Sequence, residues 1–282
     1  MEIPDLGAID EIIERGLTED VGEGDFTTLA TLPENPIAKA ECRIKSPGIL
    51  AGVEFARRVF KKVDDSVEIS IHIEDGRQVR PGDVAFTVVG RAHTLLKCER
   101  LALNAMQRMS GIATETRKAV LAVRGTKARI ADTRKTTPGF RLLEKWAVVI
   151  GGGVNHRFGL YDMILIKDNH SDLAGGVEIA LTRALQNNPR NLPIVVEARN
   201  AEEVQKILAI GGVERILLDN MPPEIVALRV KDIDGRFAVE VSGKITHYNV
   251  RDYARAGADY ISMGMLTHSY QSMDISLKTK PA

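Results

Sequence analysis

Polar or charged residues follow directly after each of six short apolar runs in the second half of the sequence. In chain order these endings are Thr133-Arg134-Lys135, Lys167-Asp168-Asn169, Glu197, Asp219-Asn220, Ser242-Gly243 and Gly264. If the runs are parallel strands, their carboxyl ends lie along one edge, which is where α/β barrels assemble their active sites. One such ending would fit an ordinary polar loop equally well, but six in succession favour a shared site.

The charge of these residues changes along the chain, from cations to carboxylates to small uncharged residues. The segment between the first two endings also contributes cations. The first part supplies cations, namely Arg134, Lys135, His156, Arg157 and Lys167. Guanidinium and ammonium groups gathered in one pocket repel each other unless an anion binds there, and arginine matches carboxylate and phosphate geometry. The next two endings supply single carboxylates, Glu197 and Asp219, which can hold Mg²⁺ or accept hydrogen bonds from ribose hydroxyls.

Small residues dominate the last two endings, Ser242-Gly243-Lys244 and Met263-Gly264-Met265. Small side chains leave backbone N–H groups free to bind phosphate, and barrels commonly place a phosphate site after their final strands. Together the endings predict a pocket for a small polyanion, a sugar with a terminal phosphate, and a divalent cation. Residue types alone do not identify the molecule that accepts the sugar.

The elements that carry these residues alternate between strands and helices. Apolar runs at 128–133, 163–167, 194–198, 216–219, 238–241 and 260–263 are separated in the later part by helical stretches at 176–186, 201–210, 223–230 and 250–256. Nearly continuous apolar strands alternating with helices indicate a buried parallel sheet. A (β/α) barrel or an open relative of it is the first interpretation, and a doubly wound open sheet is the alternative.

The first third of the sequence has a different rhythm. Helical spacing over residues 6–17 is followed by strict alternation of apolar and polar residues at 37–44, the pattern of a strand with one buried face. Short strands are expected at 67–73 and 84–89. A long amphipathic helix begins at Thr94, and Gly111 could kink or divide it.

Composition limits the class of protein. The 282 residues carry 38 Lys+Arg and 38 Asp+Glu, so the formal net charge is zero and gives no general attraction to nucleic acid or anionic membranes. Cys42 and Cys98 form no metal or disulfide motif, which fits a reducing, cytoplasmic compartment. The acidic N-terminus lacks a signal-peptide pattern, and no run of about 18 apolar residues could span a membrane.

Several segments resemble the quinolinate phosphoribosyltransferases, also called carboxylating nicotinate-nucleotide pyrophosphorylases. The most specific are TRKTTPGFR and MILIKDNH within residues 131–170. The others are GDFTT (24–28), ERLALNAMQRMSGIAT (99–114), VEAR (196–199), LLDN (217–220) and EVSGKI (240–245). The resemblance runs over nearly the whole chain.

This resemblance implies a mixed α/β fold of two domains. An N-terminal α/β sandwich domain is expected at 1–112, with the tail 271–282 packing on it, and an open α/β barrel catalytic domain at 113–270. It also implies a homodimer in which Arg100 reaches the partner's pocket.

The resemblance further implies the reaction and the role of each site residue. The phosphoribosyl group of 5-phosphoribosyl 1-pyrophosphate would pass to quinolinate with loss of CO₂, giving nicotinate mononucleotide and pyrophosphate for de novo NAD biosynthesis. Arg134, His156, Arg157 and Lys167 match quinolinate-binding positions. Lys135, Glu197 and Asp219 match positions that engage the phosphoribosyl donor and its Mg²⁺. The expected substrate contacts also include Thr133 and the two small-residue turns. Lys135, Lys167, Glu197 and Asp219 are the expected catalytic residues.

Three other functions remain open from the residues alone. Lys167 at a strand end could form a Schiff base, as in aldolase-type barrels. The arginines that accompany it argue against that chemistry. The acceptor could be a monocarboxylate such as nicotinate, which would need fewer cations. A non-catalytic phosphoribosyl-binding protein is also conceivable, although it would not require both Glu197 and Asp219. Gly151-Gly152-Gly153 lacks the spacing of a phosphate loop and is interpreted as a flexible turn.

Overall fold

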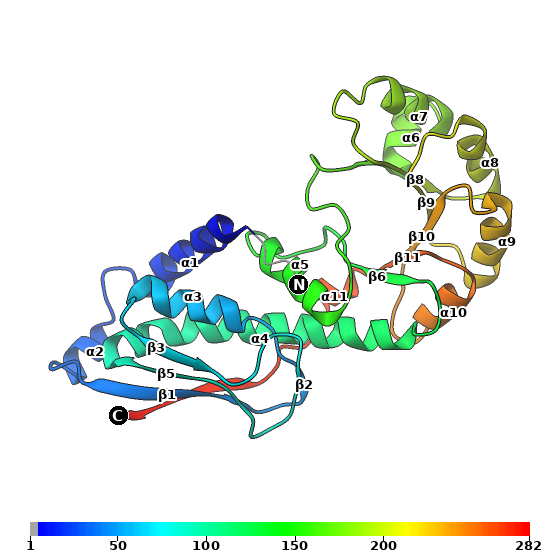
Figure 1. Ribbon diagram of the computed structural model, residues 1–282. Coiled ribbons are helices and arrows are strands. Elements are labelled where there is room, and N and C mark those ends of the chain that lie inside the picture. Colours follow the sequence, from blue (N-terminus) through cyan, green and yellow to red (C-terminus); the bar gives the residue numbers. More distant parts are fainter. Residues whose placement is uncertain (1–4) are drawn as a thin grey trace. The chain divides into compact units, whose positions relative to one another are not determined.

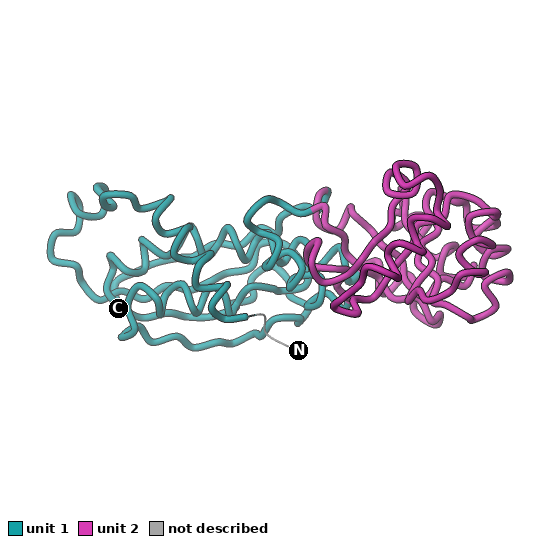
Figure 2. The backbone as a smooth tube through the Cα atoms, turned by 90° about the horizontal axis from the view of Figure 1, so that it is seen from above, with its two compact units in different colours: residues 1–117, 136–152, 269–282 teal, residues 118–135, 153–268 magenta. Residues whose placement is uncertain are grey.

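The computed structural model describes residues 5–282, which form two compact units. Unit 1 contains the chain up to Arg117 together with Thr136–Gly152 and Ser269–Ala282, and unit 2 contains Lys118–Lys135 and Gly153–His268 (Figure 2). The boundary expected at 112/113 falls within a long helix, α4 (Ala92–Ala122), whose residues belong to both units. The domain limits proposed from the sequence therefore stay a prediction.

Unit 1 is built on an antiparallel sheet in the order β12-β1-β5-β3. Its strands are β1 (Ile37–Ile44), β3 (Glu68–Ile71), β5 (Val84–Arg91) and β12 (Ile275–Pro281). The alternation predicted for 37–44 is confirmed, because every second side chain of β1, from Ala38 to Ile44, is buried. The tail 271–282 was expected to pack on this domain, but not as a strand; β12 pairs with β1 along its whole length, from Ile44↔Ile275 to Ala38↔Pro281.

Helices lie on one face of this sheet, and α3 and α4 run across it (Figure 1). Unit 1 also contains α1 (Leu6–Val21), α2 (Phe26–Thr31), α3 (Val53–Val63), α5 (Arg141–Gly151) and a two-stranded ladder of β2 (Gly48–Ile49) with β4 (Gln78–Val79). The α1 helix matches the spacing seen at 6–17 and buries Ile9, Ile12 and Ile13.

Two predictions about glycines need correction. Gly111 does not divide the long helix, since α4 is continuous through it. A Cβ at Gly111 would lie 2.3 Å from the carbonyl oxygen of Gln271, so glycine permits a close backbone approach there. The Gly151-Gly152-Gly153 segment is a helix end, because Gly151 closes α5 and Gly152, with a φ of 97°, forms its left-handed cap.

Unit 2 is built on a six-stranded sheet in the order β6-β11-β10-β9-β8-β7. All neighbouring strands are parallel, and the strands are β6 (Arg129–Ala131), β7 (Ile164–Ile166), β8 (Ile194–Ala198), β9 (Arg215–Asp219), β10 (Ala238–Ser242) and β11 (Tyr260–Ser262). Strands β7 to β11 lie side by side in chain order, and β6 pairs with the last of them. This is the order of a barrel, whereas a doubly wound sheet reverses its order near the middle.

The barrel is open between β6 and β7. In that gap β6 makes one isolated parallel bridge, from Ala131 to Val154. The helices α6 (Asp168–Ala174), α7 (Val177–Gln186), α8 (Ala201–Ile210), α9 (Pro223–Ile233), α10 (Val250–Arg255) and α11 (Met265–His268) complete the unit, with α8 to α10 along the outer side of the curved sheet (Figure 1). The expectation of an open α/β barrel is confirmed.

Candidate active site

Strand register places the predicted acidic residues on the inner face of the unit 2 barrel. In a pleated sheet, paired residues share a face and every second residue along a strand returns to it. Glu197 pairs with Leu217, and Asp219, two positions further along β9, pairs with Ser242. Glu197, Asp219 and Ser242 therefore lie on one face, at the carboxyl ends of three neighbouring strands. We call this edge the rim.

Lys167 joins the rim from the next strand. It follows β7 directly, two residues beyond Leu165, whose partner Val195 precedes Glu197 by two positions. Its side chain is exposed, and its backbone N–H donates to Nδ1 of His170 at 3.0 Å. Burial raises the pKa of the Glu197 carboxyl, the negative charge of Asp219 raises it further, and the positive charge of Lys167 acts in the opposite direction. Asp219 and Lys167 thus both act electrostatically on Glu197.

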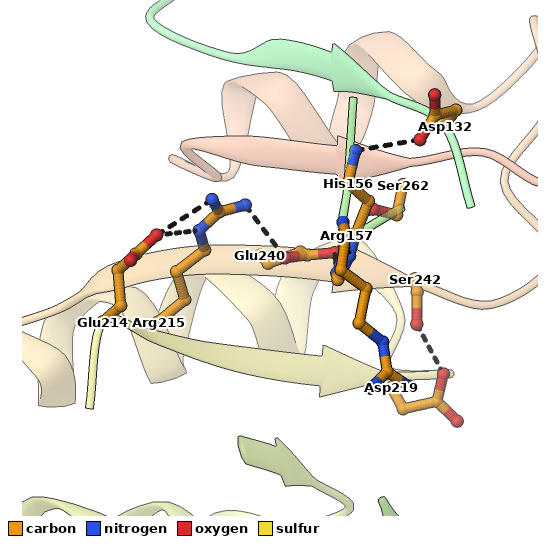
Figure 3. A network of polar contacts seen from close by, with 9 residues as sticks. All are labelled: Asp132, His156, Arg157, Glu214, Arg215, Asp219, Glu240, Ser242 and Ser262. Atoms are coloured by element: carbon orange, nitrogen blue, oxygen red, sulfur yellow. Dashed lines mark hydrogen bonds and ion pairs between the residues drawn. The ribbon is translucent and has the colours of Figure 1, made fainter. Parts of the chain in front are cut away.

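Asp219 is held in place by hydrogen bonds from its neighbours. The Ser242 hydroxyl donates to one carboxylate oxygen at 2.7 Å (Figure 3). The side-chain amide of Asn220 donates to the other. The N–H of Asn220 also donates to the Ser242 carbonyl at 3.0 Å. Asn220 has a φ of 52°, in the left-handed region that asparagine tolerates best among non-glycine residues.

Two arginines of unit 2, Arg134 and Arg157, lie close enough for their positive charges to interact. Arg157 is only 8% exposed, and the pKa of its guanidinium is lowered by burial and by the nearby charge of Arg134. The Nε of Arg134 is buried and has no hydrogen-bond partner among the residues described. A buried unpaired donor costs free energy, as does a neighbouring like charge. An anion placed between these two groups would relieve both costs.

The corner where β6 meets β11 brings further predicted residues together. The aliphatic part of the Lys135 side chain passes Gly264 so closely that a Cβ there would lie 3.0 Å from Lys135 Cδ. The Thr133 hydroxyl accepts the N–H of Lys135 at 3.0 Å and shapes the turn after β6. Thr267, in α11, donates its hydroxyl to the Lys135 carbonyl at 2.8 Å.

The predicted phosphate turns differ from each other in the structure. Gly243 and Lys244 have φ angles of 99° and 52°, which makes the turn after β10 a left-handed loop, and the Lys244 side chain is exposed. Met263 is buried, and its N–H already donates to the Ala131 carbonyl at 3.0 Å. Met263 thus extends the sheet, whereas Gly264 and Met265 are partly exposed at the corner.

The paired carboxylates are suitable for a magnesium ion that also binds substrate oxygens. Mg²⁺ is commonly held by one or two carboxylates, with phosphate oxygens and water completing its shell. Glu197 and Asp219 are such a pair. Within residues 5–282 no group of three or more His, Cys, Asp and Glu side chains forms a complete metal site.

Arg100 belongs to unit 1 and is described separately. It lies on α4 with its side chain 58% exposed, and its ion pair with neighbouring Glu99 is long, at 3.9 Å. Its expected contact with a partner subunit stays a prediction.

A buried polar network beneath the rim was missed from the sequence (Figure 3). Glu240, in the middle of β10, is fully buried and contacts the Nε2 of His156 at 3.2 Å, the Ser262 hydroxyl at 2.5 Å and Arg215 at 3.4 Å. The guanidinium of Arg215 also stacks on the Tyr260 ring, 3.9 Å from its centroid. The signal available in the sequence was a carboxylate between two valines, since a buried charge requires partners.

Asp132 is a second carboxylate that the sequence analysis did not single out. It follows β6, is fully buried, and accepts the backbone N–H of His156 at 2.8 Å. Its own N–H donates to the Val154 carbonyl at 3.2 Å. Asp132 thereby fixes the segment that carries His156 and Arg157 against the edge of the barrel.

The fold and the rim together define an α/β-barrel protein that gathers charged side chains at the carboxyl ends of its strands. Comparison with known families is more specific. Residues 112–278 match the C-terminal domain of quinolinate phosphoribosyl transferase, and residues 25–110 match its N-terminal domain. The chain belongs to the quinolinate phosphoribosyltransferase family.

Individual relatives agree with this family membership. The chain is 42% identical to "quinolinate phosphoribosyltransferase [decarboxylating] 1b" of Nicotiana tabacum, over 95% of this chain and 81% of the relative. It is 41% identical to a probable carboxylating nicotinate-nucleotide pyrophosphorylase of Bacillus subtilis, over 95% and 92% of the two chains. The crystal structure of NadC from Streptococcus pyogenes superposes with a TM-score of 0.95 at 36% identity, covering both chains completely.

Proposed function

We propose that the chain transfers the phosphoribosyl group of 5-phosphoribosyl 1-pyrophosphate to quinolinate and releases CO₂. The products are nicotinate mononucleotide and pyrophosphate, in the de novo route to NAD. Family membership supports this reaction. The structural observation that carries it is the rim, where Lys167, Glu197 and Asp219 share one barrel face.

The arginine pocket suits the acceptor. Quinolinate carries two adjacent carboxylates, and each can pair with a guanidinium. The Nε of Arg134 has no hydrogen-bond partner within residues 5–282, and the pKa of Arg157 is lowered by burial and by the charge of Arg134, so an anion bound here would stabilise both groups. Lys167 would add a third positive charge from the rim. A ligand with two carboxylates would neutralise this excess better than one with a single carboxylate.

Glu197 and Asp219 suit the donor and its metal. We propose that they hold Mg²⁺ together with the pyrophosphate oxygens of the donor, or accept hydrogen bonds from its ribose hydroxyls. When bound, the ion would stabilise negative charge that grows on the departing pyrophosphate. Lys135, whose side chain reaches the Gly264 corner, would contribute a further positive charge to that group.

The chemistry requires no covalent intermediate with the protein. The ring nitrogen of quinolinate forms a bond to the anomeric carbon as the bond from that carbon to pyrophosphate oxygen breaks. The alkylated ring is electron-deficient, so the bond to the neighbouring carboxylate can then break. Its electron pair enters the ring, CO₂ leaves, and the ring carbon takes up a proton. Positioning two anions in line can supply about 7–11 kcal/mol of the barrier reduction.

Assembly and location are part of the proposal. We expect a homodimer in which Arg100 completes the partner's acceptor pocket, which its exposed position on α4 permits. We expect a cytoplasmic enzyme, because Cys42 and Cys98 are buried free thiols whose pKa burial raises to about 12. No helix within residues 5–282 has the length and apolar character needed to cross a membrane. Balanced charge gives no reason to expect a nucleic-acid partner.

One assay tests the function directly. The purified protein is mixed with carboxyl-labelled quinolinate, the phosphoribosyl donor and Mg²⁺, and labelled CO₂ and pyrophosphate are measured. We expect both products in equal amounts, and none when nicotinate replaces quinolinate. Pyrophosphate release with nicotinate would indicate a monocarboxylate acceptor. Binding of the donor without any release of pyrophosphate would indicate a non-catalytic protein.

A further inference from the structure

Both ring nitrogens of His156 already have partners within unit 2. Its Nε2 lies 3.2 Å from Oε1 of Glu240, and its Nδ1 accepts the backbone N–H of Arg157 at 2.6 Å. The side chain is 6% exposed. A histidine that binds a substrate carboxylate through a ring nitrogen needs an N–H aimed at that substrate. In this arrangement neither nitrogen is directed to a ligand.

These two contacts determine the tautomer. A ring nitrogen that accepts a backbone N–H carries no proton, so the proton of the neutral ring is on Nε2. That proton points to Glu240, which can accept it as a carboxylate. The hydrogen bond to Arg157 is then available only while the proton stays on Nε2.

The group that fixes the tautomer is itself firmly held. Glu240 is fully buried and also contacts the hydroxyl of Ser262 and the guanidinium of Arg215, on the neighbouring strands β11 and β9 (Figure 3). The backbone N–H of His156 donates to Asp132 at the end of β6. The ring and its backbone are thus anchored to four strands of the barrel.

Arg157 is the residue at the far end of this chain of contacts. Its backbone is tied to the His156 ring, and one guanidinium nitrogen donates to the Met163 carbonyl at 3.3 Å. Arg157 is a buried residue, and its guanidinium is close enough to Arg134 for the two charges to interact. An arginine that is held at its backbone N–H and at its guanidinium keeps one orientation toward an anion.

We infer that His156 is a positioning residue whose tautomer is set by Glu240, and that it acts on the acceptor substrate only by holding Arg157. The inference rests on the proposed function for the identity of that acceptor. It changes the role expected from the sequence, in which His156 itself contacts quinolinate. Glu240, which the sequence analysis did not single out, becomes the second positioning residue of the same pocket.

The primary test reads the His156 ring directly and needs no variant. Nitrogen-15 spectra of histidine-labelled protein, with the His156 signals identified by their loss in His156→Gln, report which ring nitrogen carries a proton. We expect a protonated Nε2 and an unprotonated Nδ1, in the free protein and unchanged when quinolinate is added. A proton on Nδ1 in either state, or a change of protonation on binding, would overturn the inference.

Variants of Glu240 test the kinetic consequence. Glu240→Gln keeps an oxygen acceptor for Nε2–H, so we expect the tautomer to be retained and the KM for quinolinate to change little. Glu240→Met removes the acceptor, and we expect mixed tautomers with a KM for quinolinate raised by about 10- to 100-fold, since small misplacements have effects of this size. The KM for the phosphoribosyl donor should change far less. Equal effects of Met and Gln would contradict the inference.

A matched control removes a different bond from the same carboxylate. Ser262→Ala deletes one donor to Glu240 but leaves its contact with His156, so the tautomer should persist even if the melting temperature falls. If Glu240→Met does not fold, the wild-type spectra and Glu240→Gln still decide the question. The spectra do not depend on turnover. A wild-type protein that shows the expected tautomer but releases no CO₂ would therefore refute the proposed function and not this arrangement.

Discussion

The Ser242 hydroxyl donates a hydrogen bond of 2.7 Å to the carboxylate of Asp219, which joins the ends of β10 and β9 at the rim. Ser242→Ala would leave Asp219 with the Asn220 amide but without this donor. A hydrogen bond to a charged group is worth about 1.5–3 kcal/mol. We expect the Mg²⁺ concentration for half-maximal activity to rise by about tenfold, measured by metal titration of the steady-state rate.

The control for this variant is Ser66→Ala. Ser66 donates a similar hydrogen bond to Asp64 at 2.5 Å, but on the surface of unit 1. Its metal dependence should equal that of the wild type. An unchanged metal dependence in Ser242→Ala would show that Asp219 does not need this donor.

Gly243 tests whether the turn after β10 tolerates a side chain. Its φ is 99°, and a Cβ would lie 2.3 Å from Oδ1 and 2.9 Å from Cα of Asn220. Gly243→Ala should displace Asn220, lower stability by about 1–3 kcal/mol and reduce turnover sharply. Gly235→Ala is a matched control, because Gly235 also has a positive φ, of 69°, but open space around it. Equal activity in the two variants would contradict the predicted displacement.

Arg134 contributes positive charge at a cost to the free protein. Its Nε is buried without a hydrogen-bond partner in the described part of the chain, and its charge lies close to Arg157. We expect Arg134→Met to raise the melting temperature of the free protein while the KM for quinolinate rises by at least about tenfold. Arg251 is exposed, and Arg251→Met serves as the control, which should change neither the melting temperature nor the KM. A lower melting temperature in Arg134→Met would show that the pocket is not strained by its charges.

Arg100 can be tested by mixing two inactive proteins. If it completes the partner's site, Arg100→Ala and Lys135→Ala subunits should together form one intact site per mixed dimer. After the subunits exchange, random pairing predicts recovery of about a quarter of wild-type activity. Recovery is measured as CO₂ release against each variant alone. No recovery in dimers shown to have exchanged would place Arg100 and Lys135 in the same subunit's site.

Asp75 makes the stability of unit 1 depend on pH. Burial raises the pKa of Asp75 to about 6, against the hydrogen bonds that its carboxylate accepts, including one of 2.9 Å from Val53 N–H. Because the unfolded chain loses this proton near pH 4, the folded state loses stability as pH rises from about 4 to about 6. Asp75→Asn removes that loss and keeps an oxygen for Val53. Its melting temperature relative to the wild type should be higher at pH 7.5 than at pH 4, and a constant difference would contradict the shift.

Local patterns in the sequence were enough to predict the main elements. The alternation of β1 identified one buried face, and the apolar runs located all six strands of the barrel to within a few residues. The gathering of Lys167, Glu197 and Asp219 followed from one rule, that parallel strands end at a common edge. The structure places these residues on one face, while their catalytic roles stay predictions.

Contacts between distant positions could not be predicted in the same way. The contact of Glu240 with His156 depends on the stagger of strands and on a loop that returns to the barrel edge. The close approach of Gln271 to Gly111 and the pairing of Ile275 with Ile44 join residues far apart in the chain. The spacing of apolar residues within one segment carries no information about such long-range pairs. The role of His156 was expected from motif resemblance, whereas its two ring contacts are visible only in the folded chain.

The pairing of β12 with β1 has a consequence for biosynthesis. During translation β1 emerges long before β12, and every strand of the barrel is made between them. Until β12 arrives, β1 has an unpaired edge, and such edges promote association between chains. Nascent chains would thus pass through a vulnerable interval, and long-range pairing of this kind also slows folding. Unit 1 should therefore depend on chaperones more than unit 2 does. Its folding should also be sensitive to substitutions near residue 275, because β12 completes its sheet.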